Sequence, residues 1–415
     1  MRPATRLFNL LLLLMLTAML AGCGEDDSAA PTINDENFDT PATMAKRIGR
    51  TNEFALDLFH HMADSDDNLI VSPHSIVTCF GMAYAGARGA SEREIANTLH
   101  FNYPQQGFHS VLKELNDLLM SRQGVTLVIN NGAWGADYMT YLPEYLDTLS
   151  TAYGADMEML DFANDPEGAR QTINDWVSLH TLGRINDLFP PNSFDAVTYL
   201  VMANTTYFIA DWLHQFKPEY TWKEPFKLLD GSTVDVEVMN GEENMPFFDG
   251  DGYTALEMLY RGEKISMVVI VPDEGKYKNF EAGFTTAVFD SILANLSVQY
   301  VTFEVPKFGY FSNFDLIPTL QAMGMTGVFA AGADFSGMDG TPDGIPWIDQ
   351  VVHKGYIEIN EYGTLAFFGT GMEMTIGVHD HLDAKRPFIY VVRDIDTGTI
   401  LFMGRVLDPL RRQES

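Results

Sequence analysis

A few side-chain clusters in the sequence could do chemistry, but none amounts to a complete active site. His379, Asp380 and His381 would bring two imidazoles near a carboxylate, which is a metal-binding combination, yet no further ligand follows nearby. A solvated polar patch in an exposed loop is the simpler interpretation. Residues 339–344 begin like a calcium-binding loop but lack the third acidic position and the closing glutamate. We therefore expect no metal and no cofactor.

Catalytic motifs are also missing from the sequence. It contains no Gly-x-Ser-x-Gly elbow, no His-Glu-x-x-His pair, no phosphate-binding loop and no dinucleotide-binding glycine pattern. Cys79 lies between Ile76 and Phe80 in an apolar helical stretch, where a buried and unreactive thiol is expected. The sequence therefore predicts that the protein is not an enzyme.

Composition excludes one class of partner. The chain has 415 residues and a net charge of −31, from 57 acidic and 26 basic side chains. Nucleic-acid binding requires a basic surface, so we expect no nucleic-acid partner. Self-repulsion at this charge favours a dispersed, monomeric protein.

The first 45 residues have the composition of an export signal followed by a tether. Residues 1–22 carry two arginines and then a short apolar core, and Cys23 follows the small residues Ala21 and Gly22. This resembles a bacterial lipobox, in which the cysteine is acylated. Residues 23–45 are acidic and poor in large apolar groups, as in a flexible tether. We therefore expect an extracytoplasmic domain, residues 46–415, anchored in the lipid bilayer of the cell envelope, on the outer surface or in the periplasm.

The segment from Val351 to Phe388 combines a strand pattern with the position of a loop. It begins as an alternating strand, and some 25 residues then pass without a turn dipeptide. A loop of that length in a compact domain is usually functional or disordered. From Thr364 onward, alternate residues are largely apolar, and period-two alternation indicates a half-buried strand. The apolar set is Thr364, Ala366, Phe368, Thr370, Met372, Met374 and Ile376.

The remaining pattern predicts an α+β fold, because helices and strands are interspersed without regular strand–helix alternation. A helix is expected at 46–62, a strand at 68–71, a helix capped by Ser72 and a helix begun by a capping box at 91–94. A hairpin is expected at 226–239. No linker interrupts residues 46–410, which favours a single domain.

Several blocks, in order, resemble the serpin family over roughly residues 46–410. The blocks are Asn68–Leu99, Ile173–Phe208, Phe303–Phe308, Gly324–Met325, Ala333–Gly337, His353–Lys354, Asn360–Thr364 and Leu401–Val406. The resemblance implies three β-sheets, eight or nine helices and an exposed reactive-centre loop. It also implies a serine endopeptidase inhibitor: the protease cleaves the loop, which then inserts into the main sheet and traps the enzyme.

The resemblance also assigns roles to individual residues. A polar cluster beneath the strands that part is formed by Ser72, Ser75, Asn204 and His353. An ion pair between Lys307 and Glu361 would help to hold the loop out until cleavage. The hinge comprises Glu361, Gly363, Thr364, Ala366, Phe367, Phe368 and Gly369.

The hinge departs from the family at Phe367 and Phe368, where inhibitory serpins have small residues. Inserting Phe368 into a packed interior costs about 1–3 kcal/mol in overpacking, and its burial returns ~1.5–3 kcal/mol. The two terms roughly cancel, so they do not prevent insertion, but slower insertion would make the protein a substrate. The alternative is a non-inhibitory serpin acting as a binding or structural envelope lipoprotein.

Two ways of counting place the scissile bond. The family spacing from the hinge puts it after Gly377, and counting back from Pro387 puts it after Ile376. We take Ile376–Gly377, with Thr375 and Met374 as the next candidates. No Lys or Arg lies between positions 354 and 385, so a trypsin-like target is disfavoured. An elastase-, subtilisin- or chymotrypsin-like serine protease is expected, and a papain-like cysteine protease is a further candidate.

Overall fold

The computed structural model describes residues 41–63, 65–341, 346–364 and 380–411. These residues contain a six-stranded sheet, here called the main sheet. All neighbouring strands pair antiparallel except β2 and β3, which pair parallel. In spatial order the strands are β10 (Phe308–Asp315), β11 (Val352–Asn360), β12 (Gly363–Thr364), β4 (Leu200–Asp211), β2 (Val125–Ala136) and β3 (Met157–Leu160).

The other strands form one nine-stranded sheet, although the resemblance implies that they form two. The long strand β6 (Thr233–Gly250) joins them, because its first part pairs with β5 and its later parts pair with β9 and β7. Described residues therefore form two hydrogen-bonded sheets where three were expected. The remaining strands are β1 (Leu69–Val71), β15 (Ile400–Val406), β14 (Phe388–Asp394), β8 (Ile265–Pro272), β7 (Tyr253–Leu259), β9 (Ser297–Pro306), β13 (Asp380–Asp383) and β5 (Thr221–Lys227).

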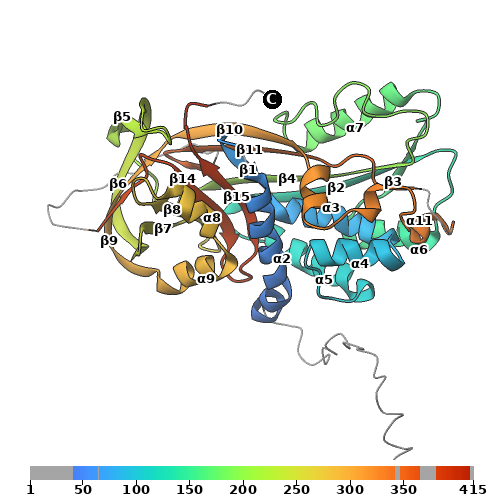
Figure 1. Cartoon of the computed structure of the whole chain (residues 1–415), viewed down its shortest axis with the longest axis horizontal. Helices are drawn as coiled ribbons and strands as arrows, with labels where there is room; N and C mark the ends of the chain where they lie inside the picture. The colour runs from blue at the N-terminus through green and yellow to red at the C-terminus, as the bar shows by residue number, and fades with distance from the viewer. Residues whose placement is uncertain (1–40, 64, 342–345, 365–379, 412–415) are drawn as a thin grey trace, which may run out of the picture. The chain divides into compact units, whose positions relative to one another are not determined.

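Helices cover both faces of the main sheet. Figure 1 shows α7 on one face, here called the outer face, and α3, α5 and α6 on the inner face. The described residues contain ten α-helices, three of them shorter than eight residues. They are α2 (Pro41–Met62), α3 (Pro73–Gly86), α4 (Gly89–Thr98), α5 (Gln105–Met120), α6 (Pro143–Tyr153), α7 (Pro166–His180), α8 (Tyr277–Gly283), α9 (Thr286–Asn295), α10 (Ile317–Ala322) and α11 (Ser336–Asp339), with 3-10 turns η1 (Pro218–Tyr220) and η2 (Gly327–Phe329).

Local sequence signals explain most of these elements. The helix predicted at 46–62 is present as α2, which buries Phe54, Leu58 and Phe59, but it begins at Pro41, so residues 41–45 of the predicted tether are helical. The cap at Ser72 is also confirmed, because its side chain accepts a hydrogen bond from the backbone N–H of Ser75 at 3.2 Å. The predicted hairpin is formed by β5 and β6. Strand β8 is buried on both faces, as its continuous apolar run indicates.

The predicted capping box at 91–94 is wrong. Helix α4 begins two residues earlier, at Gly89, so Ser91 lies within the helix and cannot cap it. Its hydroxyl accepts a hydrogen bond from the N–H of Asp334 instead, at 2.8 Å. Glu94 accepts from three successive backbone N–H groups at residues 326–328. Both side chains therefore fix a distant loop against the helix.

Candidate functional site

The main sheet is parted between β4 and β11. Among the described residues, only the two of β12 bridge these strands: Thr364 lies opposite Ala210 of β4 and Ile359 of β11. Below β12, no pairing joins β4 to β11 in the described part of the sheet. Two strands that share one neighbour lie about 9–10 Å apart, which is wide enough to admit one more strand.

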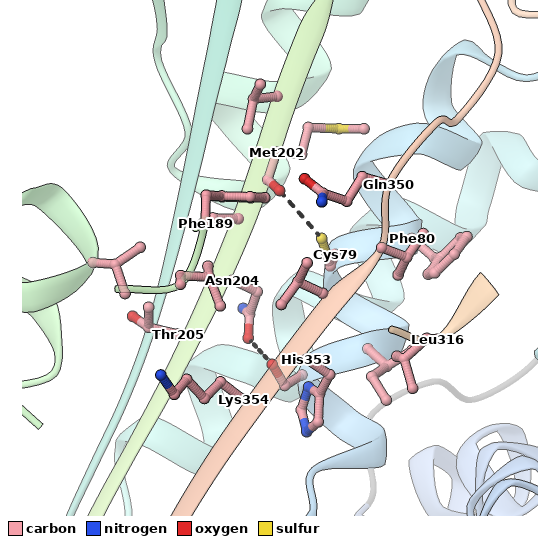
Figure 2. A pocket seen from close by; sticks show the side chains of 18 of the residues that line it. Cys79, Phe80, Phe189, Met202, Asn204, Thr205, Leu316, Gln350, His353 and Lys354 are labelled. Atoms are coloured by element: carbon pink, nitrogen blue, oxygen red, sulfur yellow. Dashed lines mark hydrogen bonds between the residues drawn. The ribbon is translucent and has the colours of Figure 1, made fainter. Parts of the chain in front are cut away.

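A cavity of about 1040 Å³ follows the line of this gap. We call it the slot. It is lined by β4 from Leu200 to Phe208 on one side and by β11 from Val352 to Glu358 on the other. Figure 2 shows Met202 and Asn204 on β4 facing His353 and Lys354 on β11, with Cys79 of α3 between them. Side chains from α3 line it too, and the segment 181–198 after α7 contributes from the outer face.

The hinge residues that the structure describes sit at one end of the slot. Thr364 is buried and its hydroxyl lies 2.9 Å from that of Tyr260, which stacks on Trp212. Gly363 has φ 151°, and a Cβ there would lie 2.1 Å from the carbonyl oxygen of Ala210. Glycine is therefore required for β12 to approach β4 so closely. The predicted hinge begins as a strand in the gap.

Lys307 and Glu361 form the predicted ion pair. Their charged atoms are 3.3 Å apart, and the Glu361 side chain is only 8 % exposed. Lys307 also lies 3.4 Å from the exposed Glu237. Burial acts to lower the pKa of Lys307, but the carboxylates of Glu361 and Glu237 outweigh burial and raise that pKa. The backbone carbonyl of Glu361 also accepts a hydrogen bond from Phe216, at 2.9 Å.

The four residues of the polar cluster are brought together on the inner face. His353 Nε2 accepts a hydrogen bond from the backbone N–H of Ser72 at 3.1 Å. The Ser75 hydroxyl bonds the side-chain oxygen of Asn204, whose amide donates to Asn131 at 2.8 Å. Burial lowers the pKa of His353 to about 4, so its imidazole is neutral at pH 7. Hydrogen bonds thus run from β11 through the start of α3 to β4, across the gap.

Cys79 lines the slot, half-buried, with its sulfur 3.9 Å from the carbonyl oxygen of Met202. Burial raises the pKa of this thiol to about 12, so it is protonated at neutral pH and a poor nucleophile. The sequence indicated the unreactive thiol but not its position in the gap.

His381 lies in a strand, not in an exposed loop as predicted. Strand β13 pairs parallel with β9, and His381 contacts the hydroxyl of Thr302 at 2.9 Å and the carboxylate of Glu304 at 3.2 Å. Hydrogen bonding to Glu304 raises the pKa of His381. Ligand atoms of Glu304, His381 and Asp383 lie within 4.8 Å of one another, but Lys385 already contacts Glu304 at 2.6 Å. The absence of a metal stays a prediction.

Other predicted residues lie outside the described part of the chain. They are Cys23, the hinge residues Ala366, Phe367, Phe368 and Gly369, and the bond Ile376–Gly377. Asp339 of the calcium-like stretch ends α11 and accepts hydrogen bonds from Thr341, as in an ordinary turn. No helix among the described residues is long and apolar enough to cross a membrane.

Slot residues that sequence reasoning missed include Thr206, Tyr207, Gly355 and Tyr356. Gly355 and Tyr356 lie in the alternating strand predicted after Val351, and Thr206 and Tyr207 lie in the block Ile173–Phe208 that resembles the family. Their relation to the gap depends on cross-strand register, which a single strand pattern does not reveal.

Comparison with known proteins identifies the family. The sequence model described as "Serpin (serine protease inhibitor)" matches residues 49–409. An uncharacterized serpin-like protein of Thermococcus kodakarensis is 31% identical, covering 97% of this chain and 99% of its own length. The human leukocyte elastase inhibitor is 32% identical, covering 88% of this chain and all of its own. The fold matches the crystal structure of human thyroxine-binding globulin, with a TM-score of 0.80, 28% identity, and coverage of 89% of this chain and 100% of that one. The chain belongs to the serpin family and has the serpin fold.

Proposed function

We propose that the protein is a suicide inhibitor of serine endopeptidases whose cleaved loop fills the slot. The single observation that carries the proposal is β12. The chain enters the gap at Gly363 and Thr364, paired to both neighbouring strands, and the rest of the gap is a cavity. Strand addition there would satisfy the unpaired edges of β4 and β11.

The chemistry at the loop would be ordinary acyl transfer. The protease serine would attack the carbonyl carbon of Ile376, and the Ile376–Gly377 peptide bond would break. The amine of Gly377 would leave with a proton from the protease histidine. Ile376 would remain on the serine as an ester, and insertion of residues 365–376 would carry the bound enzyme along the sheet before water could hydrolyse that ester.

The inner face of the slot suits the alternate residues of the loop. In the register set by Thr364, Ala366 would lie opposite the buried Phe208 and Ile357. Thr370 would lie opposite Asn204 and His353, where a hydroxyl could join the polar cluster. Apolar and polar positions of the loop therefore match those of the gap.

The expected target is an elastase-, subtilisin- or chymotrypsin-like serine protease. Positions 355–384 contain no lysine or arginine for a trypsin-like pocket. Relatives with about a third of their residues identical carry the name leukocyte elastase inhibitor. A papain-like cysteine protease is a further candidate, because its thiolate would attack the same carbonyl.

The test is to incubate residues 46–415 with elastase, subtilisin and trypsin and to analyse the mixtures by denaturing electrophoresis. We expect a covalent complex with elastase or subtilisin and a released peptide beginning at Gly377. The matched control is Thr364→Arg, which puts a charge beside the buried Tyr260 and should be cleaved without forming a complex. Efficient complex formation with trypsin would contradict the proposed specificity.

Phe367 and Phe368 replace the small residues of inhibitory serpins and therefore favour one alternative function. A non-inhibitory serpin would act as a binding or structural lipoprotein of the envelope, and a fold relative is a thyroxine-binding globulin. Clean cleavage by every protease tested, with no complex, would favour this alternative.

We also propose that residues 1–22 direct export and that acylated Cys23 anchors a monomeric domain at the cell envelope. The lipobox-like sequence and the acidic residues that follow Cys23 support this. In a bacterial host, the full chain should partition into detergent, and Cys23→Ser should move it to the aqueous phase. Equal partitioning of the two chains would refute the anchor.

A further inference from the structure

We infer that the slot carries two preformed receptor sites for Phe367 and Phe368, one on each face of the main sheet. This inference rests on the proposed function, because it assumes that residues 365–376 enter the slot. It names the described residues that would contact Phe367 and Phe368 after insertion, and it makes these contacts determinants of inhibition.

The register of β12 gives the position of each inserted residue. Thr364 lies opposite Ala210 of β4 and Ile359 of β11, and β12 is antiparallel to both strands. Each further loop residue therefore moves one position back along β4 and one position back along β11. Because side chains alternate between faces, residues 366 and 368 would, once inserted, share the inward direction of the buried Thr364, and residue 367 would point outward.

Phe368 would lie opposite Gly355 of β11 and Thr206 of β4. Gly355 has no side chain on the inner face, and a Cβ there would already lie 3.3 Å from Ile70 beneath it. An aromatic ring on the adjacent strand can cover such a glycine, which is a recognised cross-strand pairing. Thr206 is half-buried, and its hydroxyl bonds Asn204 at 3.2 Å. After insertion, Phe368 would therefore lie beside the one inner-face position of β11, between His353 and Ile357, that lacks a side chain.

Phe367 would lie opposite Tyr207 and Tyr356 on the outer face. Tyr356 already packs against Phe311 of β10, with ring centroids 4.4 Å apart, and Arg184 lies 5.3 Å over its ring. Inserted Phe367 would extend this arrangement into an aromatic row from β10 to β4. Cross-strand aromatic pairs stabilise sheets. Tyr207 and Tyr356 would therefore provide favourable contacts for the large side chain of Phe367, where inhibitory serpins have a small residue.

The test uses synthetic peptides of residues 365–376 annealed to the intact domain, with insertion followed as a rise in melting temperature. We expect the wild-type peptide to insert. Peptides carrying Phe367→Ser should insert more weakly. Gly355→Val should slow insertion of the wild-type peptide by about tenfold or more, because overpacking opposes the ring, and should not slow the Phe368→Ala peptide. In the Tyr356→Ser domain, the wild-type peptide and the Phe367→Ser peptide should insert equally well.

Peptide variants in the wild-type domain keep the test valid if Gly355→Val folds poorly. The control substitution is Gly309→Ala in β10, where a Cβ would meet only ordinary contacts at 3.4 Å or more. If no peptide inserts, the proposed function itself fails. If every peptide inserts equally well into the wild type, Gly355→Val and Tyr356→Ser, the receptor sites are refuted while loop insertion stands.

Discussion

Glu361 shows how one side chain can hold the sheet in its present state. Its carboxylate is almost fully buried and pairs with Lys307, at the first residue of the hinge. Glu361→Gln should lower the free energy of unfolding by about 1–2 kcal/mol, between the values for exposed and buried pairs. It should also promote polymers on heating. Calorimetry and native gels would measure both effects.

Glu237→Gln is the matched control for Glu361→Gln. Glu237 contacts the same lysine at 3.4 Å, but its side chain is mostly exposed, so its loss should change stability little. If both variants behave alike and form no polymers, Glu361 has no special role at the hinge.

His353 makes the stability of the gap depend on pH. Its pKa of about 4 lies below the ordinary value of 6.5. Above pH 6.5 the imidazole is neutral in both the folded and the unfolded chain, so its titration does not change the free energy of unfolding. Between pH 6.5 and 4 the unfolded chain binds a proton that the folded chain excludes. The free energy of unfolding should therefore decrease as the pH is lowered through this range, by about 3 kcal/mol in total.

His353→Gln should therefore flatten the dependence of unfolding free energy on pH between 6.5 and 4. Denaturant titrations at several pH values would measure the slope. His74 and His109 also have pKa values lowered to about 4 by burial and should supply the slope that remains. An unchanged slope in the variant would show that His353 takes up its proton without opening the cluster.

At the scale of elements, β12 depends on Gly363. A Cβ at this position would collide with the backbone of β4, 2.1 Å from the Ala210 carbonyl oxygen. Gly363→Ala should therefore displace β12 and turn the proposed inhibitor into a substrate, with several-fold more protease-cleaved chain per complex formed. The ratio of cleaved to complexed chain measures this. Gly283→Ala, where a Cβ would meet nothing within 4 Å, should leave the ratio unchanged.

The elements themselves could largely be predicted from the sequence. Periodicity and capping residues located α2, α3 and the β5–β6 hairpin because these signals are local. The same reasoning misplaced the start of α4, because Ser91 and Glu94 bind a loop more than 230 residues away. Strand pairing through β6 was missed for the same reason: sheet membership depends on distant partners.

The same distinction, between features that the sequence indicates and features that depend on distant partners, applies to the residues of the candidate site. Ser72, Ser75, Asn204 and His353 were found through family resemblance, and the structure joins them. Gly355 and Tyr356 were not found, because an ordinary glycine and tyrosine in an alternating strand acquire meaning only when the gap and its register are known.

At the scale of the whole molecule, the parted main sheet implies a native state that is not the most stable arrangement of the chain. Two strand edges face a cavity of about 1040 Å³, so within the described part of the chain their backbone groups lack strand partners along most of the gap. Filling the gap with one more strand would form backbone hydrogen bonds and bury apolar surface. Cleavage of the loop should release that stabilisation.

The melting temperature of the domain before and after cleavage by elastase or subtilisin tests this most directly. We expect the cleaved chain to melt at a much higher temperature than the intact chain, and cleaved Thr364→Arg to show no such rise. Equal melting temperatures for the intact and cleaved wild-type chains would contradict insertion of the loop into the slot.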